Sequence, residues 1–63
     1  MRFKIKEYRE KMNMSQKKLA ELADVSRATV SGLESGSTTI TTTDTLIRIA
    51  RVLGVKVSDI FLE

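Results

Sequence analysis

The sequence predicts an all-α domain made of five short helices. Apolar residues recur at spacings of three and four along most of the chain, which is the period of an amphipathic helix. Proline is absent and glycine occurs only at positions 32, 36 and 54, so few positions interrupt the helical pattern. We expect residues 1–63 to form a single domain, because no linker, repeat or change of composition divides them.

The first helix is expected over about residues 2–12. Ile5, Tyr8 and Met12 share one face of this segment, and Asn13 interrupts the pattern. The helix should therefore pack through one side only.

Two shorter helices are expected over residues 16–23 and 27–35. Ser15 and Ser26 each stand where a side-chain oxygen can cap the first turn. The apolar positions that we expect to face inward are Leu19, Leu22, Ala23, Val30 and Leu33. Two capped helices separated by three residues form a helix-turn-helix unit.

The segment that follows the third helix is less regular. Gly36 stands where a helix end favours a left-handed residue, and the threonine-rich stretch 37–45 disfavours a helix interior. An edge strand is conceivable here, but we expect an ordered loop anchored by Ile40. One of residues 41–43 should then cap a fourth helix over 43–53.

The fourth helix should bury one face and expose the other. Its expected inward residues are Leu46, Ile49, Ala50 and Leu53. Arg48 and Arg51 are expected to face solvent, and Gly54 ends the helix. Ser58 is expected to cap one last short turn of helix.

Composition restricts the possible function. Cysteine and histidine are absent, which excludes disulfides, zinc fingers and imidazole catalysis. Since no carboxylates converge, we expect no enzyme activity, metal or cofactor. The segment MRFKIKEYREK is too charged for a secretory signal, and no apolar run approaches the ~20 residues that span a bilayer. We therefore expect a cytoplasmic protein that does not associate with membranes.

The net charge of +3 lies in the first half of the chain. Residues 1–36 hold eight Lys and Arg against five acids, whereas residues 37–63 hold three of each. A small basic domain favours a polyanionic partner, although a solvated surface explains the excess equally well.

The stretch MSQKKLAELADVSRATVSGLESG resembles the helix-turn-helix domain of phage repressors and Cro proteins, the Xre family. The segments SQKKLA, VSRATVS, LESG and ARVLGVKVSDIF also occur in family order, so the resemblance covers nearly the whole chain. It implies a lambda-repressor-like fold, a role as a small transcriptional repressor, and double-stranded DNA as the partner. The third helix would then lie in the major groove.

Arg9 and Glu34 are expected to form a structural ion pair. Both lie beside apolar faces, where opposite charges must pair or carry a large penalty. The family resemblance implies a clamp between the first and third helices that orients the recognition helix. The alternative is a plain surface ion pair that contributes little.

The resemblance also implies DNA contacts. Gln16 matches the family's glutamine at the start of the second helix, where backbone amides can hold a phosphate. Arg27 begins the third helix and can donate two parallel bonds to guanine. The alternative roles are a solvated residue for Gln16 and a phosphate contact or free charge for Arg27. The other expected contacts are Lys17, Lys18, Ser26, Ala28, Thr29, Ser31, Gly32, Ser37 and Thr38.

Gly32 raises a separate question, because glycine weakens a helix by roughly 0.5–1 kcal/mol relative to alanine. At about 100° per residue, the positions opposite Val30 and Leu33 are Ala28, Ser31, Gly32 and Ser35. We expect a bare outer face that lets the backbone approach DNA closely. The alternative is a weak position that makes no contact.

The loop after LESG departs from the family pattern. Family members often place Lys or Arg and then Pro there, whereas STTITTT is uncharged. Its hydroxyls and amides can still reach phosphates, but the usual cationic contact is missing.

The apolar C-terminal segment predicts a partner chain. Val57, Ile60, Phe61 and Leu62 crowd a segment too short to bury them all, which favours a homodimer on a two-fold operator. The alternative is that these residues close the small core. A second function class is an antitoxin-type module that binds a toxin protein and represses its own operon. RNA binding is disfavoured, because three scattered aromatic residues offer no stacking platform.

Overall fold

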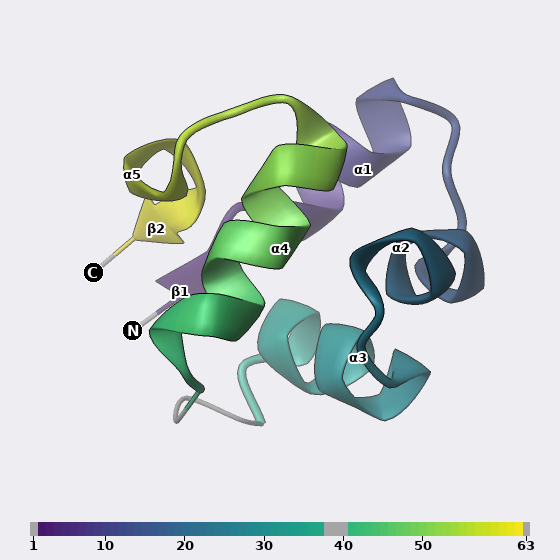
Figure 1. The fold of residues 1–63 in the computed structure, drawn as a ribbon, viewed down its shortest axis with the longest axis horizontal. Coiled ribbons are helices and arrows are strands. Elements are labelled where there is room, and N and C mark those ends of the chain that lie inside the picture. Colours follow the sequence, from purple (N-terminus) through teal and green to yellow (C-terminus); the bar gives the residue numbers. More distant parts are fainter. Residues whose placement is uncertain (1, 38–40, 63) are drawn as a thin grey trace.

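Five helices and two short strands build the domain in the computed structural model, which describes residues 2–37 and 41–62 (Figure 1). In chain order they are β1 (Arg2–Phe3), α1 (Ile5–Lys11), α2 (Gln16–Ala23), α3 (Arg27–Ser35), α4 (Thr43–Leu53), α5 (Val57–Ile60) and β2 (Phe61–Leu62). The all-α prediction is confirmed, and the bounds of α2, α3 and α4 are those expected from the sequence. The loop position of Ile40 lies outside the described residues.

Both ends of the described chain pair in a small antiparallel sheet that was not predicted. Arg2 pairs with Leu62 and Phe3 with Phe61. The rings of Phe3 and Phe61 also meet edge to face, with centroids 5.8 Å apart. Because the chain is extended at Arg2–Phe3, α1 begins at Ile5 instead of near residue 2.

Side-chain caps set the starts of the three long helices. Ser15 Oγ accepts a hydrogen bond from Lys18 N at 3.0 Å, and Ser26 Oγ accepts one from Thr29 N at 3.0 Å. Thr42 caps α4, within the range expected from the sequence. These serine and threonine predictions are confirmed.

Of three further predicted helix caps, the two glycines that end α3 and α4 are confirmed and the serine at the start of α5 is not. Gly36 and Gly54 adopt left-handed conformations, with φ of 82° and 72°, and end α3 and α4 as predicted. The cap at Ser58 is wrong, because α5 begins one residue earlier and Lys56 is its N-cap. The carboxylate of Asp59 accepts a hydrogen bond from the Lys56 backbone at 2.9 Å and stabilises that earlier start.

The core gathers apolar side chains from every helix. Its buried members are Phe3, Ile5, Leu19, Ala20, Ala23, Val30, Leu33, Ile49, Ala50, Leu53 and Ile60. Ile60 is fully buried and Val57 is half-buried, so this part of the C-terminal segment closes the core. Phe61 remains 40% exposed.

Two predicted core positions are wrong. Leu22 is 52% exposed, because the buried arc of α2 runs through Leu19, Ala20 and Ala23 and leaves Leu22 to one side. Met12 is 46% exposed, because α1 ends at Lys11 and the chain turns away there.

The arrangement of the helices leaves α2 and α3 accessible along one side of the domain. In Figure 1, α2 and α3 lie together, α4 runs across the middle, and α5 lies with the strands at the opposite side. Arg48 and Arg51 are exposed on α4, as predicted. Among residues 2–37 and 41–62, no helix has both the length and the apolar character needed to cross a bilayer.

Candidate nucleic-acid interface

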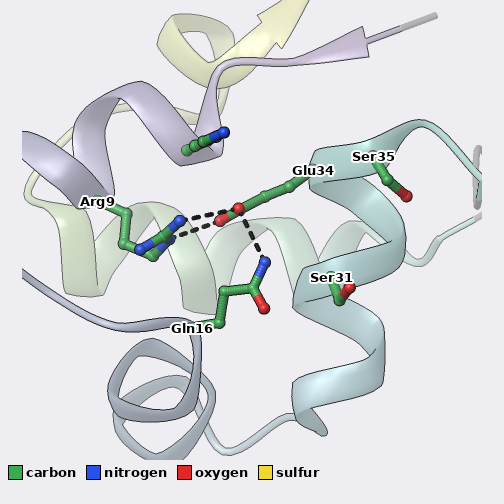
Figure 2. A pocket seen from close by; sticks show the side chains of 6 residues that line it. Arg9, Gln16, Ser31, Glu34 and Ser35 are labelled. Carbon is green, nitrogen blue, oxygen red and sulfur yellow. Dashed lines mark hydrogen bonds and ion pairs between the residues drawn. The ribbon is translucent and has the colours of Figure 1, made fainter.

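A buried ion pair joins α1 to α3. Arg9 Nε donates to Glu34 Oε2 at 2.7 Å, and Arg9 Nη2 donates to Glu34 Oε1 at 3.0 Å (Figure 2). The two side chains are only 11% and 4% exposed. The predicted pair is confirmed, and its burial and two parallel bonds distinguish it from a plain surface ion pair.

Arg9 also fixes the turn that leads into α2. Its Nη1 donates to the carbonyl oxygen of Met14 at 2.6 Å. The hydrogen bonds that Arg9 donates to the Glu34 carboxylate raise the pKa of Arg9 above its ordinary value, although burial acts in the opposite direction. Arg9 is therefore a permanent cation that connects α1, the turn before α2, and α3.

Gln16 is the third member of this network. Its Nε2 donates to Glu34 Oε1 at 3.1 Å, so the first residue of α2 is tied directly to α3 (Figure 2). This contact of Gln16 was not predicted from the sequence, which indicated a contact with DNA. We call Arg9, Gln16 and Glu34 the clamp, because they hold the helix-turn-helix pair and α1 in one arrangement.

The face of α3 that points away from the core carries the expected candidates. Arg27, Ala28 and Ser31 are exposed, and they lie along the first turn and a half of the helix. Thr29 is half-buried, and its backbone N–H and its hydroxyl both bond to Ser26 Oγ, at 3.0 and 2.7 Å. The other exposed candidates are Lys17, Lys18, Ser26 and Ser37. Thr38 lies outside the described residues.

The expected position of Gly32 on the bare outer face is wrong. The structure buries Gly32, and its carbonyl oxygen accepts hydrogen bonds from Gly36 N at 3.1 Å and from Ser35 Oγ at 3.3 Å. A glycine offers only backbone atoms to solvent, and here the Ser35 side chain folds back over them. The small residues that remain on the surface of α3 are therefore Ala28, Ser31 and Ser35.

An open pocket of about 260 Å³ lies beside the clamp. It is lined by Lys6, Arg9, Gln16, Ser31, Glu34 and Ser35, which come from α1, α2 and α3 (Figure 2). Lys6 is not among the site residues predicted from the sequence. The available signal was its spacing, since Lys6 precedes Arg9 by three residues and three-residue neighbours share a helix face. Within the part of the chain that the structure describes, no group of three His, Cys, Asp or Glu side chains could hold a metal ion.

Two capped helices, α2 and α3, are joined by residues 24–26 and locked to a third helix, with the outer side of α3 exposed. This arrangement defines a helix-turn-helix protein. The helix-turn-helix family model HTH_3 matches residues 5–60, and the chain belongs to this family. The resemblance to Xre-type domains is thereby confirmed.

Comparison with known proteins gives one relative from a sequence comparison and two similar solved structures. An uncharacterized HTH-type transcriptional regulator of Archaeoglobus fulgidus is 42% identical over 62 residues, which cover 98% of this chain and 86% of that protein. The crystal structure of SinR, the master regulator for biofilm formation, in complex with DNA is 33% identical with a TM-score of 0.82, over 86% of each chain. SinR in its complex with SinI is 34% identical with a TM-score of 0.81, over 84% of this chain and 52% of that chain.

Proposed function

We propose that the chain binds double-stranded DNA sequence-specifically and acts as a small transcriptional regulator, with α3 in the major groove. The observation that carries the proposal is the clamp, which holds α3 rigidly while leaving Arg27, Ala28 and Ser31 exposed. The similarity to SinR, whose structure contains DNA, supports it. This role is binding and not catalysis, and it corresponds to a cytoplasmic protein.

The dimensions of α3 suit this role. An α-helix with its side chains is about 10–12 Å in diameter, and the major groove is about 12 Å wide, so α3 can enter it. The first residues of a recognition helix are those that reach base edges, so Arg27 is the proposed base reader. Its guanidinium would donate to a guanine, while the short side chains of Ala28 and Ser31 let the helix approach closely.

The start of α2 is the proposed phosphate contact. The first backbone amides of a helix attract anions, and Lys17 and Lys18 are exposed in the first turn of α2. Such contacts set the position of the protein on the duplex without reading its sequence. Gln16 is the first residue of α2, and its side chain extends towards Glu34 of α3. We propose that it also contacts the DNA strand that passes the start of α2.

The proposal is tested by selection of bound sequences from a random duplex library, followed by affinity measurement on the enriched sequence. We expect one motif to be enriched, and we expect the selected duplex to bind much more tightly than a scrambled one. Single-stranded RNA of the same length is the control for attraction by net charge alone. Equal affinity for the selected duplex, the scrambled duplex and the RNA would contradict the proposal.

We also propose that the regulator is a homodimeric repressor on a two-fold site. The support is Phe61, which stays 40% exposed on β2 beside Phe3 and is available to a second copy. Half-sites should lie about 10 base pairs apart, centre to centre. Sedimentation of the free chain and of its complex with the selected duplex tests this, and a monomer in both conditions would contradict it.

A second candidate function is binding of a partner protein, as in antitoxins. It is favoured by Leu22 and Met12, two large apolar side chains that are about half exposed. SinR also forms a complex with the protein SinI, which supports this class of role. Co-purification from the native source distinguishes it, because a stoichiometric second chain would be retained by the wild type and lost by Leu22→Ser.

A further inference from the structure

We propose that the pocket beside the clamp binds a backbone phosphate of duplex DNA and that Lys6 supplies its positive charge. This inference rests on the proposed DNA-binding function and adds a contact from α1. The family resemblance assigned the DNA contacts to the second and third helices and to the loop after them. Here a cation from the first helix joins that surface.

The position of the pocket makes this contact possible. Ser31 and Ser35 line its wall on α3, and both follow Arg27 at successive four-residue intervals. Residues spaced by four lie in one row along a helix, so the pocket continues the row that begins with the proposed base reader. Lys6 and Gln16 approach that row from α1 and α2. A DNA strand along the edge of the groove would pass over this opening.

The charge of the pocket suits an anion. The Glu34 carboxylate is almost completely buried, and both its oxygens accept hydrogen bonds from the clamp. Its charge is therefore compensated by Arg9. Lys6 is exposed, and the ion pairs found among the described residues do not include it. The pocket consequently has a net positive charge.

The remaining lining groups suit phosphate oxygens. The hydroxyl of Ser31 is exposed and can donate a hydrogen bond, as serine commonly does to DNA phosphates. The Ser35 hydroxyl donates its single proton within the protein, to the Gly32 carbonyl or to Ser37 Oγ, so Ser35 contributes to the wall of the pocket and not to its donors. The segment from residue 35 to residue 43 contains no Lys or Arg, so the stretch after α3 offers no cation of its own. Lys6 is the lysine that lines the pocket and can supply that charge.

The test compares three variants of the full chain on the selected duplex and on a scrambled duplex. Lys6→Gln removes the charge with similar length, and Lys6→Arg keeps the charge. Lys56→Gln is the matched control, since it makes the same charge change on the exposed residue that precedes α5, at the other side of the domain from α2 and α3 (Figure 1). Fluorescence anisotropy is measured from 50 to 200 mM salt, and circular dichroism confirms folding.

We expect Lys6→Gln to make the slope of log affinity against log salt shallower by about 0.9, which is the value for one phosphate. Over that fourfold range of salt, the wild type should therefore lose about 3.5-fold more affinity than Lys6→Gln. Both duplexes should show the same change, because a phosphate contact carries no sequence information. Lys6→Arg and Lys56→Gln should keep the wild-type slope.

Three outcomes overturn the proposal. The first is a Lys6→Gln slope equal to that of Lys56→Gln. The second is a loss confined to the selected duplex, which would make Lys6 a base reader. The third is saturable binding of inorganic phosphate at low millimolar concentration that Lys6→Gln removes, together with a wild-type affinity of Lys6→Gln for both duplexes at every salt concentration, which would assign the pocket to a free anion. A wild-type chain that binds no duplex would instead refute the proposed function itself.

Discussion

Removing Glu34 should destabilise the fold far more than removing an exposed carboxylate. Glu34→Ala leaves the Arg9 guanidinium, which is 11% exposed, without its two bonds to the carboxylate, and it leaves Gln16 Nε2 without its acceptor. Breaking a buried pair by removing one partner costs about 3–5 kcal/mol. Here Arg9 keeps its bond to the Met14 carbonyl and water can enter through the open pocket, so we expect a loss of about 2–3 kcal/mol.

That loss is large for a chain of this size. At roughly 0.05–0.15 kcal/mol per residue, the whole domain has roughly 3–9 kcal/mol of stability. A loss of about 2–3 kcal/mol should lower the melting temperature by roughly 8–24 °C. Urea denaturation followed by circular dichroism measures the free energy of unfolding, and a thermal melt measures the melting temperature.

The matched control is Asp44→Ala, which breaks the pair between Asp44 Oδ2 and Arg48 Nε. That pair is also short, at 2.9 Å against 2.7 Å for Arg9 and Glu34, but its side chains are 69% and 44% exposed, so we expect a cost below about 1 kcal/mol. The double variant of Arg9→Ala and Glu34→Ala should cost less than the two single changes added together, because both remove the same interaction. If Glu34→Ala and Arg9→Ala each cost no more than Asp44→Ala, the clamp does not stabilise the fold.

The pH dependence of this effect follows from the raised pKa of Arg9. A group whose pKa is higher in the folded state contributes stability that is fully present below its unfolded pKa and is lost as the pH rises through the folded pKa. Both values for Arg9 lie in the strongly alkaline range. The difference in stability between wild type and Glu34→Ala should therefore stay constant between about pH 7 and 10.

Features decided within one helical turn could be predicted from the sequence. A cap such as Ser15 or Ser26 acts on an amide three residues ahead, and Gly36 acts on the turn that it closes. Their neighbours in the sequence are also their neighbours in space, so the bounds of α2 and α3 were predicted correctly.

Features that depend on another element were missed. The pairing of Arg2 with Leu62 joins segments from opposite ends of the chain, and two residues are too few to show an alternating pattern. Leu22 follows the helical period closely enough to be assigned to the core. Its exposure depends on which arc of α2 the other helices cover.

At the candidate site, too, one contact could be predicted from the sequence and others depend on how the helices pack. The pairing of Arg9 with Glu34 was predicted, because a charge on an apolar face requires a partner and the resemblance indicated which one. The bond of Gln16 to the same carboxylate and the position of Lys6 depend on how closely α1, α2 and α3 approach one another. Periodicity carries no information about that distance.

Three further substitutions test the interface and the backbone. Arg27→Ala should relax base preference at one position of the selected duplex at a cost of about 1–3 kcal/mol, whereas an equal loss on every sequence would make Arg27 a phosphate contact. Asp24→Gly should raise stability by up to about 1 kcal/mol in urea denaturation, because Asp24 ends α2 with φ of 58° and its exposed pair with Arg48, at 3.6 Å, contributes little. An unchanged or lower urea midpoint would show that this conformation carries no strain. Gly32→Leu should destabilise the fold, because Gly32 is buried and a leucine side chain needs space there. Leucine gains about 1 kcal/mol in helix propensity, but a side chain forced into a covered position costs about 1–3 kcal/mol, so the net change should be a loss. A thermal melt measures this change directly. If Gly32→Leu melts at or above the wild-type temperature, the backbone at this position is open after all, and its affinity for the selected duplex then reports whether α3 needs a bare surface there.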